Sequence, residues 1–191
     1  AQRLSYVGEL GFELYIDIED AKEIYQLIIL EGKNHNLSHC GSHAMDTMRM
    51  ESGFLHWGHD ISPEENQYEA GLSFTISYKK EIDFIGKESL LKIKNKKTKK
   101  KFIMLSLKNS KPGIPLLLHD EPIYLDDKII GRTTSGNYSF NYKKNLSFGY
   151  IDSSLTDEEL KNKTLYIEVA KHKNQAIHEI KPLKDNKARL S

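Results

Sequence analysis

The segment Arg3-Leu4-Ser5-Tyr6-Val7-Gly8-Glu9-Leu10-Gly11-Phe12-Glu13-Leu14 decides how this 191-residue chain is interpreted. Residues 3–7 and 12–18 alternate in polarity on either side of a turn with two glycines, which predicts a β-hairpin. The glycines let the backbone approach a planar ligand. Tyr6, Glu9 and Glu13 add an aromatic ring and two carboxylates, and a carboxylate can accept two hydrogen bonds from the N–H edge of a pterin or guanine. From spacing alone, the same residues also fit the solvent face of a structural hairpin.

The rest of the first half is predicted to be mainly helical. Asp20 and Glu23 have the spacing of a capping box, and the apolar residues that follow predict a helix that Gly32 stops. A second helix is expected over residues 42–51, with Met45 and Met48 as core residues. Residues 54–70 predict a long ordered loop, residues 72–76 a strand, and residues 86–94 a short helix.

A run of lysines at residues 94–101 predicts a solvated connection between two domains. Beyond it, short strands separated by turn residues predict a small antiparallel barrel. The expected fold class is therefore α+β, with a partial α/β domain at residues 1–95 and a barrel at 100–185. The expected strands are Phe102–Leu107, Pro115–His119, Lys128–Thr134, Leu146–Tyr150, Thr164–Ala170 and Gln175–Lys181.

The composition narrows the class of protein. Positive and negative side chains balance to a formal net charge of +1, which gives no general attraction to nucleic acid or anionic lipid. No apolar run approaches the ~18 residues that a membrane helix needs. Cys40 is the single cysteine, so a reducing compartment is expected, cytoplasmic or the mitochondrial matrix. The chain starts in what reads as the middle of a strand, and we expect it to be a fragment of a longer protein.

Several motifs in order along the chain resemble those of the glycine cleavage T-protein (aminomethyltransferase) family. The hairpin segment resembles the family's Y-x-G-E-x-G-[FW]-E, and residues 48–54, Met-Arg-Met-Glu-Ser-Gly-Phe, resemble L-R-L-E-x-G-[YF]. Residues 57–61, Trp-Gly-His-Asp-Ile, resemble the W-G-x-[DE]-[LIM] of members linked to dimethylglycine and sarcosine dehydrogenases. Further matches are Glu69-Ala70-Gly71-Leu72, Phe84-Ile85-Gly86-Lys87, Gly131-Arg132-Thr133-Thr134-Ser135-Gly136 and Phe148-Gly149-Tyr150.

The resemblance implies a folate-binding α/β domain followed by the family's C-terminal barrel. It also implies transfer of a one-carbon unit from a small amine-derived donor to tetrahydrofolate, with an FAD domain upstream in dehydrogenase-type chains. The family's folate contacts fall on Tyr6 and Glu13, with Glu9 as a neighbour. Arg49 and Trp57 are further candidates, Arg49 for a folate carboxylate or an ion pair with Asp46, and Trp57 for stacking. The family's catalytic aspartate belongs to a segment upstream of Ala1, so no catalytic residue is expected here.

Two departures refine this interpretation. Classical aminomethyltransferases carry Ala-Arg-Asp where this chain has Ala44-Met45-Asp46, which favours a dehydrogenase-linked relative and predicts no folate-tail contact at Met45. The residues Pro182-Leu183-Lys184-Asp185 resemble the family's P-[LF]-Y-D, with lysine in place of the aromatic.

Alternative functions remain open. One is a folate-binding protein that transfers nothing, although the K-G-C-x-x-G-Q signature of such relatives is absent. Another is a module that binds RNA or protein, although the lysine run lacks an aromatic stacking series. A metal site is not expected, because neither His56-x-x-His59-Asp60 nor the group of His39, Cys40 and His43 follows a recognised ligand pattern.

Overall fold

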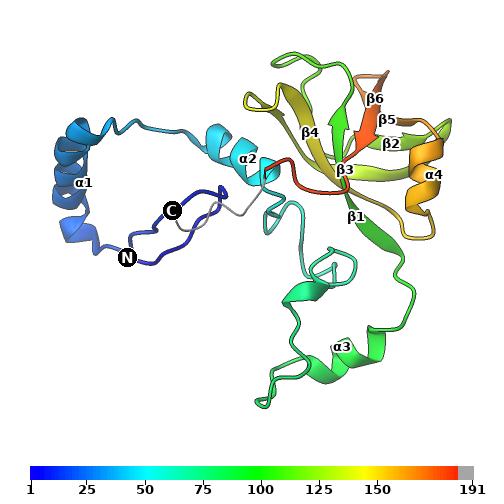
Figure 1. Ribbon diagram of the computed structural model, residues 1–191, viewed down its shortest axis with the longest axis horizontal. Coiled ribbons are helices and arrows are strands. Elements are labelled where there is room, and N and C mark those ends of the chain that lie inside the picture. The colour runs from blue at the N-terminus through cyan, green and yellow to red at the C-terminus, as the bar shows by residue number, and fades with distance from the viewer. Residues whose placement is uncertain (185–191) are drawn as a thin grey trace.

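The computed structural model describes residues 1–184. Its main feature is a closed barrel of six antiparallel strands in the order β1-β4-β3-β2-β5-β6 (Figure 1). The expected α+β class with an antiparallel barrel is therefore confirmed. The strands are β1 (Lys100–Leu107), β2 (Pro122–Leu125), β3 (Lys128–Ser139), β4 (Lys144–Asp152), β5 (Leu165–Val169) and β6 (His172–His178).

The barrel is filled by side chains that alternate along its strands. Ile103, Leu105 and Leu107 of β1 point inward, as do Ile123 of β2 and Ile167 of β5, and all are almost fully buried. Because successive strand residues face opposite sides, the intervening positions remain available to contact other elements. The barrel therefore has its own core and also presents an outer face.

One helix of the first half packs on that outer face. Helix α2 (Ser42–Glu51) lies against β3 and β4, and its Met50 joins Leu146 and Phe148 in a second apolar cluster. Gly53 follows the helix with φ 73°, a conformation that favours glycine, and the Gly53 amide donates to the Met50 carbonyl. This packing fixes α2, and the residues that α2 carries, relative to the barrel.

The other helices are peripheral. Helix α1 (Ile18–Gly32) contains no buried residue and stands apart from the barrel in Figure 1. It continues into the 3-10 turn η1 (Lys33–His35); a second 3-10 turn, η2 (Ser73–Thr75), precedes α3 (Lys87–Ile93). Helix α4 (Asp157–Asn162) covers one end of the barrel with Leu160 and begins with the capping box of Thr156 and Glu159. No helix among the described residues is long and apolar enough to span a lipid bilayer.

Two expected strands are wrong. Residues 115–119 form a loop in which Leu117 is buried but the Leu118 amide donates to the Glu121 carboxylate. That local bond replaces a strand ladder, and β2 takes the place in the barrel. Residues 73–75 form the turn η2, because the Thr75 amide and hydroxyl both donate to the Leu72 carbonyl.

The expected hairpin is reduced to a single bridge. Gln2 and Glu13 exchange two backbone hydrogen bonds of 2.8 and 2.9 Å, and no regular strand forms on either side. A two-stranded ribbon is marginal without a further strand or helix against it, and here Leu10, Phe12 and Leu14 are exposed. Within the described residues no sheet packs on these apolar side chains, so the predicted strands do not form.

Two details of the predicted helices also need correction. Helix α1 begins at Ile18, not after Asp20, because the amides of Asp20 and Ala21 both donate to the Asp17 carbonyl, so no capping box forms there. Met45 is 44% exposed and therefore is not a core residue, although the predicted bounds of its helix, residues 42–51, are confirmed.

Candidate functional site

A cavity of about 440 Å³ lies where α2, the loop after it and strand β3 meet. Tyr6 lines it together with Met45 and Arg49 of α2, His56 and His59 of the loop, and Ser135 of β3. The loop at residues 116–119, which was predicted as a strand, forms another part of the wall. Segments far apart in sequence therefore create this cavity, and the packing of α2 on the barrel sets its shape.

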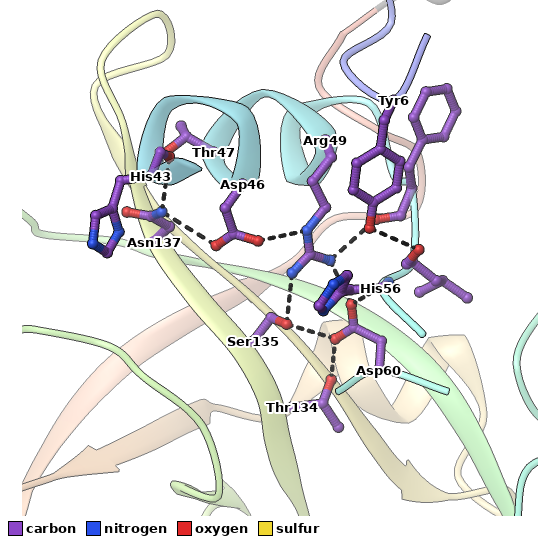
Figure 2. A network of polar contacts seen from close by, with 12 residues as sticks. Tyr6, His43, Asp46, Thr47, Arg49, His56, Asp60, Thr134, Ser135 and Asn137 are labelled. Carbon is purple, nitrogen blue, oxygen red and sulfur yellow. Dashed lines mark hydrogen bonds and ion pairs between the residues drawn. The ribbon is translucent and has the colours of Figure 1, made fainter. Parts of the chain in front are cut away.

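Arg49, which lines the cavity, forms a buried ion pair with Asp60 behind the cavity wall (Figure 2). Arg49 is 1% exposed, and its other donors reach the Asp46 carboxylate at 2.7 Å, the Phe54 carbonyl at 3.1 Å and the Ser135 hydroxyl at 2.8 Å. The guanidinium group also lies 5.4 Å from the centre of the Phe148 ring. Four of the five Arg49 N–H donors thus bond to α2, the loop and β3, so Arg49 joins these three segments.

Asp60 is equally well satisfied. Its carboxylate accepts hydrogen bonds from the Thr134 hydroxyl at 2.6 Å, the Ser135 hydroxyl at 2.7 Å and the His56 amide at 2.9 Å, besides the pair with Arg49. With this many donors, the buried carboxylate holds its neighbours in fixed positions. We refer below to Arg49, Asp60, Thr134 and Ser135 as the polar hub.

Tyr6 is the predicted site residue that lies best for ligand contact. Its hydroxyl donates to the Leu55 carbonyl at 2.9 Å, and its ring is stacked on Phe54 with centroids 6.4 Å apart. Burial raises the pKa of Tyr6 above its usual 10.0, an effect that the nearby Arg49 charge partly offsets. The phenol is therefore neutral at physiological pH. Tyr6 also borders a second, more apolar cavity of about 630 Å³ on its other side.

The remaining predicted site residues are not gathered with Tyr6. The Glu13 carboxylate is exposed and accepts a hydrogen bond from the Tyr15 hydroxyl at 2.8 Å. Glu9 is paired with Lys184, and Trp57 is 66% exposed. None of these three lines either cavity. The expected convergence of Tyr6 and Glu13 on one cleft is thus not found within the described residues.

Sequence reasoning did not assign roles to the hub residues Asp60 and Ser135. Both belong to motifs that resemble the family, Trp-Gly-His-Asp-Ile and Thr-Thr-Ser-Gly. They are 75 residues apart, so no local sequence pattern predicts that they bond to each other. The cavity wall also carries two stacked imidazoles, His56 and His59, with centroids 4.7 Å apart. Residues 1–184 contain no group of three His, Cys, Asp or Glu side chains arranged to hold a metal ion.

Comparison with known proteins agrees with this architecture. Residues 1–80 match the family model described as the GCVT N-terminal domain, and residues 100–183 match the glycine cleavage T-protein C-terminal barrel domain. The two matches together cover most of the chain in the order of the family. The chain therefore belongs to the glycine cleavage T-protein, or aminomethyltransferase, family.

Individual relatives fall in both branches that the motifs indicated. Human mitochondrial dimethylglycine dehydrogenase is 36% identical over 157 residues, which are 82% of this chain and 18% of the relative. An aminomethyltransferase of Listeria innocua is 38% identical over 160 residues, 83% of this chain and 42% of the relative. The chain thus spans less than half the length of these enzymes.

A solved structure supports the fold. The crystal structure of glycine cleavage system aminomethyltransferase T from Bartonella henselae matches with a TM-score of 0.79 and 21% sequence identity. The match covers 95% of this chain and 48% of that one. At this identity, the likeness establishes the shared fold and nothing further.

Proposed function

We propose that this chain is the folate-binding portion of a tetrahydrofolate-dependent one-carbon transferase. The observation that carries the proposal is the position of Tyr6, the aromatic residue of the family's hairpin motif, on the wall of a cavity that is also lined by Arg49, Thr134 and Ser135 of the polar hub. The transferred unit would come from a small amine-derived donor. In a chain of the dehydrogenase type, an FAD domain would generate that donor.

The contacts suggest a separate role for each part of the chain. Residues 1–95 would be the C-terminal part of the folate-binding domain, and residues 100–185 the barrel, of which Asp185 lies outside the described residues. Tyr6 would offer its ring and a neutral hydroxyl to the folate, while the polar hub keeps the cavity wall rigid. A ligand held in fixed orientation and shielded from water reacts faster, because less entropy is lost on the way to the transition state.

The arginine-to-methionine difference at residue 45 fits this assignment. Met45 lines the same cavity as Tyr6 and is 44% exposed, so it would give the folate an apolar contact. Arg49 is a poor substitute for the missing arginine, since it is 1% exposed and four of its five N–H donors are used by Asp46, Asp60, Phe54 and Ser135. We therefore propose that Arg49 supports the site through the cavity wall instead of touching the folate tail.

We propose that the Glu13 carboxylate accepts hydrogen bonds from the N–H edge of the pterin. Its carboxylate is exposed and has one hydrogen bond, from Tyr15, so it retains acceptor capacity for a ligand. Contact with the ligand in the Tyr6 cavity requires the segment that follows the turn, residues 11–14, to move when folate binds. Glu9 and Trp57, which were also candidates, lie outside the cavity, and we give them no direct contact in this proposal.

Calorimetric titration with tetrahydrofolate tests the proposal. Glu13→Ala should weaken binding by about 1.5–3 kcal/mol, or roughly ten- to hundredfold, because charge-assisted hydrogen bonds are lost. Glu13→Gln should recover little, since an amide accepts at one atom only. Glu23→Ala, an exposed glutamate of α1, is the matched control and should bind as the wild type does. A wild-type chain that binds oligonucleotides and not tetrahydrofolate would show that the module has a different function.

A further inference from the structure

The last described residues, Pro182–Lys184, form a strap that runs from the barrel to the N-terminal turn. Leu183 packs beside Met50, Leu146 and Phe148, the cluster that joins α2 to the barrel. The Lys184 amide donates to the carbonyl of Glu51, at the end of α2, at 2.9 Å. In Figure 1 the strap leaves the barrel and ends beside α2. It is therefore anchored on one side before its side chains reach the turn.

The Lys184 side chain continues this link into the turn that follows Tyr6. Its ammonium group donates to the Val7 carbonyl at 3.3 Å and forms an ion pair with the Glu9 carboxylate. The lysine side chain is only 14% exposed, whereas Glu9 is half exposed. The two partners of the ammonium group flank Gly8, which has φ 69°. Lys184 thus holds both sides of a turn whose backbone conformation is unusual.

Side-chain hydroxyl groups of Ser5 and Ser52 also bind this turn. The Ser5 hydroxyl accepts from the Glu9 amide at 3.2 Å, and the Ser52 hydroxyl donates to the Val7 carbonyl at 3.3 Å. No regular strand includes residues 3–7. A segment without a strand ladder has low local stability, so a few tertiary contacts decide its conformation. Tyr6 lies directly before Val7, so these contacts fix its backbone, while its side chain is also held by the Leu55 carbonyl and the Phe54 ring.

We propose that Lys184 is a positioning residue for the folate site, acting through Val7 and Glu9 to hold Tyr6 at the cavity. This inference rests on the proposed function. It also assigns Glu9 a specific role as the counter-ion of the strap. A turn that is already ordered loses less entropy when the ligand binds, so the strap increases affinity without touching the folate.

The test uses the complete 191-residue chain and tetrahydrofolate. Lys184→Met keeps an apolar side chain of similar length and removes the charge, and should weaken binding by roughly two- to tenfold, the range of a partly exposed ion pair. Lys184→Arg should restore most of the affinity. The exchange of charges in Lys184→Glu with Glu9→Lys should bind better than either single variant. Lys181→Met, an exposed lysine of the same segment, should bind as the wild type does.

A structural role in the barrel alone would not give this pattern of rescue. Hydrogen exchange provides the second measurement, and the amides of residues 5–11 should exchange faster in Lys184→Met than in Lys181→Met. If wild type and Lys184→Met bind tetrahydrofolate equally, the strap inference is wrong and the proposed function stands. If the wild type binds no folate, the proposed function fails, and the strap's positioning role for a folate site is overturned with it. Faster exchange would then mark Lys184 only as a clamp of the turn.

Discussion

Removal of the Asp60 carboxylate should destabilise the fold more than most single substitutions. In Asp60→Ala, Arg49 loses its buried counter-ion, and the Thr134 and Ser135 hydroxyls and the His56 amide lose their acceptor. Asp46 remains beside Arg49 but is 36% exposed and bonds to Nε only. The guanidinium is therefore left partly unpaired in a place from which water is excluded.

The expected cost is about 3–5 kcal/mol of unfolding free energy, the usual penalty for removing one partner of a buried ion pair. For a chain of this length each kcal/mol corresponds to about 2–4 °C, so the melting temperature should fall by roughly 6–20 °C. Urea and thermal unfolding followed by circular dichroism measure both quantities. Asp127→Ala removes an aspartate whose side chain is fully exposed and paired with Lys173, and should cost less than about 1 kcal/mol.

The double variant Arg49→Met with Asp60→Leu provides a further check. Replacement of both charges by apolar side chains avoids the unpaired buried ion, so the double variant should be less destabilised than the sum of the two single variants, by about 0.5–3 kcal/mol. An Asp60→Ala variant with the stability of the Asp127→Ala control would refute the conclusion that the hub is a buried, tightly bonded network.

Two further predictions concern the barrel and its contact with the loop before it. Gly131→Ala should destabilise the barrel by about 1–3 kcal/mol in urea unfolding, because the new Cβ would lie 1.9 Å from the Tyr150 carbonyl oxygen of β4. Gln175 is exposed on β6, so the control variant Gln175→Ala should have nearly the stability of the wild type. Glu65 is largely buried, which raises its pKa, but hydrogen bonds from Lys100 and Ser62 outweigh burial and hold the pKa below the usual 4.5. Ionised Glu65 therefore stabilises the fold above about pH 4.5, and this stabilisation is lost as the pH falls through its lowered pKa. Between about pH 5 and pH 3, the melting temperature should fall more in the wild type than in Lys100→Met. Equal slopes would show that this pair does not contribute.

Local sequence patterns were sufficient for much of the fold. Short alternating segments separated by turn residues predicted the barrel, because a strand with one buried face needs that alternation whichever strands it pairs with. Helix α2 was predicted with its observed bounds, residues 42–51, since its apolar spacing and the glycine after it are local features. The T-x-x-E signal at Thr156–Glu159 was also present in the sequence and would have located α4.

Local sequence patterns could not predict which distant segments pair with each other. The apolar residues at 115–119 bury Leu117, but β2 occupies the barrel position, because a short apolar segment does not say which strand it will pair with. The hairpin at residues 3–18 failed for the related reason that two alternating segments form a stable ladder only when something packs on their apolar face. These residues match the family motif but form no regular strands.

The sequence by itself determined the family, the barrel, and the presence of Tyr6, Glu13 and Arg49 in motifs that other members share. Only the tertiary structure decided what those residues do in this chain. It bonded Arg49 to partners 11 and 86 residues away, left Glu13 outside the cavity, and brought Lys184 to Glu9 across 175 residues. Charge pairing and burial depend on distances in space, and a single sequence does not contain those distances until the barrel and α2 have packed together.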